Sequence, residues 1–112
     1  MKRDTRIIEV AGRNWLTAQL LLEGIRVATP TFDEGIDLIA FKEIPTHGIK
    51  ALPLQLKCAR EEVFSLDRKY ADRNMAMVYV WNVLEAPSAY VLSYEEAHEL
   101  LGNSRQTPGR FS

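Results

Sequence analysis

The sequence predicts a single α/β domain in which helices flank a mixed central sheet. Near the N-terminus, apolar residues recur every three to four positions, as on one face of a helix. Later apolar runs are short and end at turn residues, as strands do. The chain has 112 residues, 46% of them hydrophobic and 26% charged, which is enough apolar material for one small core. A sheet flanked by helices is an arrangement that buries both kinds of element.

The first predicted element is a helix that Asp4 caps and Gly24 ends. Its apolar stripe is wide enough to predict burial on more than one side. The stripe comprises Ile7, Ala11, Trp15, Ala18 and Leu22, widened by Leu16, Leu20 and Leu21.

Three strands are predicted next, at residues 25–30, 36–44 and 49–59. The second and third of these form a hairpin closed by the turn PTHG at residues 45–48. The hairpin places two short polar motifs, one on each strand, close to one another.

The second half of the chain predicts two helices and two strands. A helix is expected at 65–74, a strand covered on both faces at 75–83, another strand at 85–93 and a helix at 93–102. The full order is therefore helix, three strands, helix, two strands, helix. No internal repeat or linker interrupts it, so residues 1–103 are predicted to form one domain and residues 104–112 a polar C-terminal tail.

Composition excludes several classes of function. The formal net charge of -1 gives no general basic field, so any attraction to nucleic acid must come from a local patch. One cysteine excludes internal disulfides and cysteine-rich zinc sites, and His47 and His98 lie in unrelated contexts. No apolar run approaches the roughly 20 residues of a membrane span, so no membrane association is expected. The N-terminus lacks the apolar region of a signal peptide, so a cytoplasmic location is expected.

The hairpin carries the candidate site. Asp37 opens one strand, and Gln55 and Lys57 share a face of the other because alternate residues of a strand point the same way. A hairpin centred near residue 46 sets Asp37 opposite this pair. A carboxylate and an amide oxygen suit Mg²⁺, and a lysine near a phosphate suits hydrolysis. The simpler alternative is that Asp37 caps a turn and Lys57 only extends from a strand edge.

Three segments, LLLEGIRVATP, EGIDLIAF and LQLK, stand in an order that resembles the PD-(D/E)xK nuclease-like superfamily. Its small stand-alone members include restriction-endonuclease-like and Holliday-junction-resolvase-like proteins. The resemblance covers about residues 5–103 and implies a restriction-endonuclease-like core of order α-β-β-β-α-β. It implies that Asp37 binds metal, that Gln55 replaces the usual second acid and that Lys57 is the catalytic lysine. The implied activity is hydrolysis of DNA phosphodiester bonds by an endodeoxyribonuclease dependent on Mg²⁺ or Mn²⁺.

The first helix departs from this pattern, because Arg13 occupies the position where many relatives carry a glutamate. Glu9, one turn earlier, and Glu34, three residues before Asp37, are the other carboxylates expected near the metal. The alternative function is therefore a catalytically inactive nuclease-fold module that binds DNA or a partner protein. A third alternative is an unrelated α/β domain in which Asp37, Gln55 and Lys57 do not converge.

Basic residues after the candidate site are the expected DNA contacts, because they can meet the phosphate backbone. Acidic residues are interleaved with them, so a solvated mixed-charge face is the alternative. Cutting both DNA strands would favour a two-fold homodimer. The basic residues are Arg60, Arg68, Lys69 and Arg73, and the acidic ones are Glu61, Glu62 and Asp67.

Overall fold

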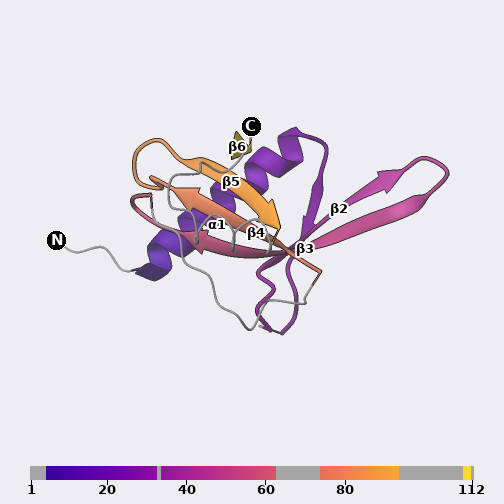
Figure 1. Ribbon diagram of the computed structural model, residues 1–112, viewed down its shortest axis with the longest axis horizontal. Helices are drawn as coiled ribbons and strands as arrows, with labels where there is room; N and C mark the ends of the chain where they lie inside the picture. Colours follow the sequence, from indigo (N-terminus) through magenta and orange to yellow (C-terminus); the bar gives the residue numbers. More distant parts are fainter. Residues whose placement is uncertain (1–4, 33, 63–73, 94–109, 112) are drawn as a thin grey trace.

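The computed structural model describes residues 5–32, 34–62, 74–93 and 110–111, and the statements below concern these residues. They form one helix followed by six strands (Figure 1). The predicted helices at 65–74 and 93–102 fall almost entirely outside the described residues. The elements are α1 (Thr5–Leu22), β1 (Arg26–Ala28), β2 (Leu38–Ile44), β3 (Gly48–Cys58), β4 (Ala76–Trp81), β5 (Ser88–Ser93) and β6 (Arg110–Phe111).

The strands form one mixed sheet in the order β1-β2-β3-β4-β5-β6. Strands β3 and β4 are parallel, whereas every other neighbouring pair is antiparallel. This confirms the predicted α/β class with a mixed sheet. Two residues of the predicted polar tail, Arg110 and Phe111, pair with β5 as strand β6. The one helix that the structure describes, α1, is not long and apolar enough to cross a membrane.

The β2–β3 hairpin has the register that the sequence predicts. Pairing runs from Leu38 opposite Leu54 to Ile44 opposite Gly48, which centres the hairpin on residue 46. Thr46 and Gly48 adopt positive φ angles of 67° and 77°, and they turn the chain between the strands. The pairing therefore brings the residue before β2, Asp37, next to the far end of β3.

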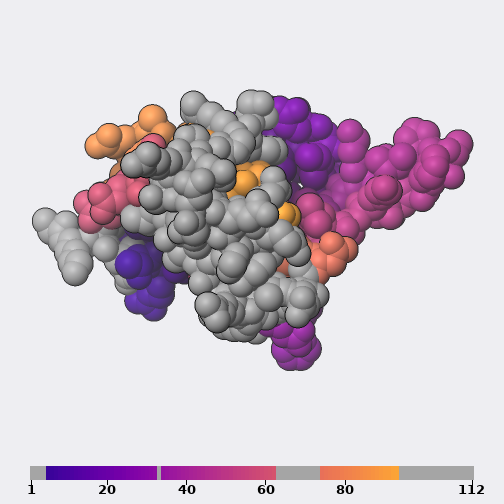
Figure 2. Space-filling view, in the orientation of Figure 1, coloured from indigo at the N-terminus to yellow at the C-terminus, as the bar shows by residue number. Residues whose placement is uncertain are grey.

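The outer part of this hairpin extends beyond the rest of the sheet. Strand β1 pairs with β2 only as far as Phe41, and β4 begins to pair with β3 only at Leu54. Residues 42–53, here called the hairpin arm, therefore project from the body of the molecule (Figures 1 and 2). The candidate site lies at the opposite end of β3.

Helix α1 packs on one face of the sheet through residues spaced four apart. Ile8, Gly12, Leu16 and Leu20 are buried. Leu16 and Leu20 join a core cluster with residues of the sheet, and the sheet residues are Leu38, Leu54, Ala76, Val78, Val80 and Ala89. This face fixes which helix residues turn toward the end of β3.

The buried face of α1 begins one residue later in the sequence than predicted, at Ile8 instead of Ile7. Ile7 and Leu22, placed on the buried face, are 51% and 82% exposed, and Leu21 is 53% exposed, so only one side of α1 is covered. The reason is Gly12, which has no side chain and so does not contribute to the apolar pattern. A Cβ atom at Gly12 would lie 2.6 Å from the Cys58 Sγ atom, so glycine is what lets α1 approach β3 this closely.

Strand β4 is buried along its whole length, which confirms the prediction that both its faces are covered. Val78 and Val80 pack on the α1 side of the sheet. Met77, Tyr79 and Trp81 form a second cluster with Leu92 on the other face. The rings of Tyr79 and Trp81 lie 6.2 Å apart and those of Trp81 and Tyr90 4.8 Å apart, so aromatic packing holds this face together.

Candidate functional site

The candidate site lies where pairing between β2 and β3 ends. The Asp37 backbone N–H donates a 2.8 Å hydrogen bond to the Leu54 carbonyl, which is the last backbone contact of the hairpin. Beyond it, no described strand pairs with this edge of β3. The Leu56 N–H instead donates a 2.7 Å hydrogen bond to Oδ2 of Asp37. The Asp37 carboxylate therefore closes an otherwise open strand edge, and one of its oxygens remains for another contact.

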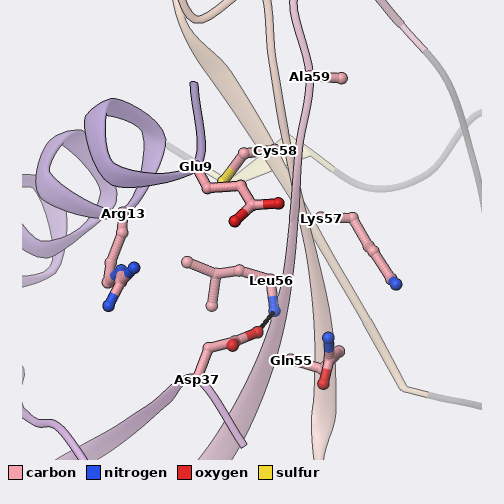
Figure 3. Close-up of a pocket in the computed structure, with 8 residues that line it drawn as sticks. All are labelled: Glu9, Arg13, Asp37, Gln55, Leu56, Lys57, Cys58 and Ala59. Carbon is pink, nitrogen blue, oxygen red and sulfur yellow. Dashed lines mark hydrogen bonds between the residues drawn. The ribbon is translucent and has the colours of Figure 1, made fainter. Parts of the chain in front are cut away.

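A pocket of about 250 Å³ opens at this edge (Figure 3). Helix α1 contributes two charged side chains to it, the hairpin contributes Asp37, and the end of β3 contributes the rest. The lining residues are Glu9, Arg13, Asp37, Gln55, Leu56, Lys57, Cys58 and Ala59.

The structure thus brings Asp37, Gln55 and Lys57 to one pocket, with Glu9 beside them. Of the other predicted residues, Glu34 and Arg60 are exposed and do not belong to the described lining of this pocket. The predicted DNA contacts Arg68, Lys69 and Arg73 lie outside the described residues. Asp37, Gln55 and Lys57 therefore line one pocket, as the first reading of the sequence expects.

The three residues reach the pocket from two sides of β3. Gln55 and Lys57 project from the face opposite to Leu56 and Cys58, as strand alternation predicts. Figure 3 shows the Asp37 carboxylate on the other side of the strand from them, turned toward the backbone of Leu56. The three side chains therefore meet around the free edge of β3 rather than on one flat face.

Gln55 carries the least expected feature of the pocket. The residue is only 7% exposed, and its Oε1 atom is buried without a hydrogen-bond partner among the described residues. Leaving a buried amide oxygen unsatisfied costs about 1–3 kcal/mol. Such an atom is rare in native proteins, and an ion is one of the partners that can satisfy it.

The donor atoms fit Mg²⁺ or Mn²⁺. A carboxylate and an amide oxygen are hard ligands, and Mg²⁺ commonly binds one or two carboxylates and keeps several waters. The described residues contain no cluster of three His, Cys, Asp or Glu side chains that would hold a metal alone. A cation held by these residues would therefore keep several of its waters.

Cys58 lines the pocket from the α1 side but is not a nucleophile at neutral pH. The pKa of its thiol is raised to about 11, first by burial and then by the carboxylates of Glu9 and Asp37, whereas Arg13 lowers it. Cys58 alternates with Gln55 and Lys57 along β3 and projects to the other face of the strand. It still belongs to the pocket because the cavity extends around the strand edge.

Two contributors were missed at the level of sequence. Arg13 occupies the position where the resemblance implies an acid, yet it lines the pocket from α1. The Leu56 backbone N–H holds the Asp37 carboxylate, and no sequence pattern announces that contact. The signal for Arg13 in the sequence is its place one turn after Glu9 on the same helix face.

Searches of family models, of curated proteins and of solved structures find no match to this chain.

Proposed function

We propose that the protein is a divalent-metal-dependent endodeoxyribonuclease of the PD-(D/E)xK nuclease-like superfamily. The observation that carries the proposal is that Asp37, Gln55 and Lys57 line one pocket at the free edge of β3, where the buried Gln55 also has an amide oxygen without a hydrogen-bond partner among the described residues. The order of α1 and the first four strands supports a restriction-endonuclease-like core, because antiparallel β1, β2 and β3 are followed by a parallel β4.

Asp37 and the Gln55 carbonyl would hold Mg²⁺ or Mn²⁺, with the Glu9 carboxylate available in the same pocket. When bound, such an ion lowers the pKa of a coordinated water and polarises the phosphate. The chain itself fixes the ligands. The Leu56 N–H orients the Asp37 carboxylate, and burial in β3 restricts the Gln55 side chain.

Lys57 would supply the charge that hydrolysis requires. Its ammonium extends from the same face of β3 as Gln55 and can donate to a non-bridging oxygen of the scissile phosphate. Negative charge on those oxygens grows as water attacks, so a fixed cation stabilises the transition state more than the bound substrate. Water would form the new bond to phosphorus as the P–O3′ bond breaks, without a covalent enzyme intermediate. The attacking water releases one proton to solvent and the leaving O3′ takes up one, which gives a 5′-phosphate and a 3′-hydroxyl.

The test is nicking of supercoiled plasmid by the purified chain with and without Mg²⁺ or Mn²⁺. We expect cleavage only with the metal, and loss of cleavage in Lys57→Ala. Lys50→Ala is the matched control, because it removes a lysine from the arm on the same strand. Unchanged activity in Lys57→Ala, or in the presence of a chelator, would contradict this mechanism.

The second candidate is an inactive nuclease-fold module that binds DNA or a partner protein. The observation that favours it is the small number of acids in the pocket, with Arg13 in place of a carboxylate on α1. Calorimetry separates the two functions. Absence of divalent-ion binding together with salt-sensitive DNA binding supports the inactive module. Double-strand breaks rather than nicks would support a two-fold homodimer, because each chain has one such pocket in its described part.

A further inference from the structure

Helix α1 exposes a second apolar face, opposite to the one that packs on the sheet. Figure 1 shows the helix lying across the sheet, and its main contacts are with β1, β3 and β4. Ile7, Val10 and Leu21 are each about half exposed. With the exposed Asn14 and Ala18 they recur every three to four residues, so they share one side of α1. These five residues are here called the outer face.

The outer face contains no charged side chain. The three charged residues of α1, Arg6, Glu9 and Arg13, lie three or four residues apart along one flank of the helix. A helix that meets water on one side usually carries its charged residues there, whereas a helix that is apolar on both sides is buried on both. A second apolar surface is therefore the partner that fits the outer face, and the phosphates of DNA do not fit it.

The outer face is symmetric about Asn14. Ile7 and Leu21 each lie seven residues from Asn14, and Val10 and Ala18 each lie four residues from it. If two antiparallel copies of α1 meet at Asn14, Ile7 of each copy faces Leu21 of the other. Val10 of each copy then faces Ala18 of the other, which sets a larger side chain against a smaller one. A two-fold interface requires this self-complementarity, because one surface serves both partners.

Asn14 at the centre of this face also favours a second copy. An amide side chain has both donors and an acceptor, so two Asn14 side chains can hydrogen-bond to each other across a two-fold axis. A single asparagine among the apolar positions of paired helices fixes their register at a cost in stability. Against a purely apolar partner, the same amide would lose its hydrogen bonds to water and gain none.

We propose that the outer face of α1 binds the same face of a second copy of this chain, as an antiparallel helix pair with its two-fold axis at Asn14. With 18 residues that rise about 1.5 Å each, α1 is about 27 Å long. A pair of such helices gives an interface of the small class, below about 1,200 Å² in total, which is typical of transient complexes. The dimer should therefore dissociate on dilution.

The two-fold axis relates like flanks of the two helices. The flank with Glu9 and Arg13 lines the pocket, so the two pockets of the dimer would open on the same side. The inference does not depend on the proposed nuclease function, because helix pairing requires neither metal nor DNA.

The experiment is sedimentation equilibrium of the full chain without metal or DNA, from low micromolar to near-millimolar concentration. We expect a reversible dimer and a melting temperature that rises with protein concentration. Val10→Lys buries a charge in the interface and should weaken dimerisation at least about tenfold. Ala18→Lys should do the same, and it judges the inference if Val10→Lys does not fold. Ile49→Lys is the matched control, because it makes the same kind of change at an exposed residue of the hairpin arm.

Crosslinking tests the antiparallel arrangement in a Cys58→Ser background. Asn14→Cys should form a disulfide-linked dimer under mild oxidation, because a residue on the two-fold axis lies next to its own copy. Ile7→Cys alone should not crosslink, and neither should Leu21→Cys alone. A mixture of these two variants should crosslink, since each residue faces the other across the interface.

A chain that stays monomeric at every concentration would overturn the inference. So would a dimer that Val10→Lys and Ala18→Lys leave intact, and loss of the dimer in Ile49→Lys would assign the contact to the hairpin arm. Efficient crosslinking of Ile7→Cys to itself would contradict the antiparallel arrangement. A monomer that binds phosphatidylglycerol vesicles and loses this binding in Val10→Lys would assign the outer face to a lipid surface. A dimer without nuclease activity would support this inference and contradict the proposed function.

Discussion

Replacing Gly12 by alanine tests how closely α1 must approach the sheet. The added Cβ would lie 2.6 Å from the Cys58 Sγ atom, 3.0 Å from the Cys58 Cβ atom and 3.4 Å from the Val83 Cγ2 atom. The first two distances are shorter than van der Waals contact. The Cys58 Cβ atom is fixed to the backbone of β3, so rotation of the thiol alone does not make room. The helix must move away from the strand.

Two opposing effects set the magnitude. Alanine in place of glycine inside a helix stabilises by about 0.5–1 kcal/mol. Overpacking a close contact destabilises by about 1–3 kcal/mol. Because two of the three contacts are too short and one involves a rigid atom, the second effect should prevail. We expect Gly12→Ala to lower the free energy of unfolding by about 1 kcal/mol or more.

The assay is equilibrium urea unfolding of the wild type, Gly12→Ala, Cys58→Ala and the double variant. The Gly12→Ala change should cost less in the Cys58→Ala background, because the atom at 2.6 Å is then absent. A Gly12→Ala variant as stable as wild type would refute the close packing. So would a cost that does not depend on residue 58.

Three further predictions concern the edge of the pocket and the arm. Asp37→Ala should lower the free energy of unfolding by about 1.5–3 kcal/mol because the Leu56 N–H loses a charged acceptor. Asp37→Asn keeps an acceptor oxygen, so urea unfolding should show a smaller loss of stability. Equal losses in the two variants would contradict this account. Since burial raises the pKa of Cys58 from 9.0 to about 11, the unfolded chain loses a proton that the folded chain keeps. The free energy of unfolding should therefore fall by up to about 1.4 kcal/mol per pH unit between those values, and Cys58→Ser should remove that part of the slope. Lys42 and Lys50 lie directly opposite each other in the hairpin, so their like charges repel. Lys50→Glu should therefore raise the free energy of unfolding by about 0.2–1 kcal/mol in urea. Adding Lys42→Glu restores a pair of like charges and should cancel the gain.

The hairpin could be predicted from sequence because its signals are local. Alternating residues and a four-residue turn determine its register, and the register alone places Asp37 beside Gln55. The burial of β4 is likewise predicted by a continuous apolar run. Both features depend on neighbours within a few residues, which a pattern records directly.

The face of α1 and the role of Arg13 could not be predicted in the same way. Apolar residues surround much of this helix, so periodicity does not identify the side that packs. Gly12 determines the side that packs, because its lack of a side chain lets α1 approach Cys58 closely. Arg13 then lies at the pocket because its neighbour lies against β3. Such contacts depend on the distance between two elements, which a pattern does not contain.

Substitution of Gln55 distinguishes a structural role of this side chain from a role in binding a ligand. If no ligand contacts the buried Oε1 atom, this atom only lowers the stability of the fold. Gln55→Met removes the unsatisfied oxygen while nearly preserving the shape of the side chain. We expect Gln55→Met to be more stable than wild type by about 1 kcal/mol without metal. It should also lose the increase in melting temperature that Mg²⁺ and a short DNA duplex with phosphorothioate linkages, which resist cleavage, together give to wild type. A variant that gains stability and still responds fully to Mg²⁺ would show that Gln55 holds no metal. A variant that loses stability would show that the oxygen already has a partner within the protein. If Gln55 binds the metal, Gln55→Met should be more stable than wild type and its melting temperature should no longer rise with Mg²⁺. The reason is that a binding residue keeps a polar group unsatisfied until the ligand is present.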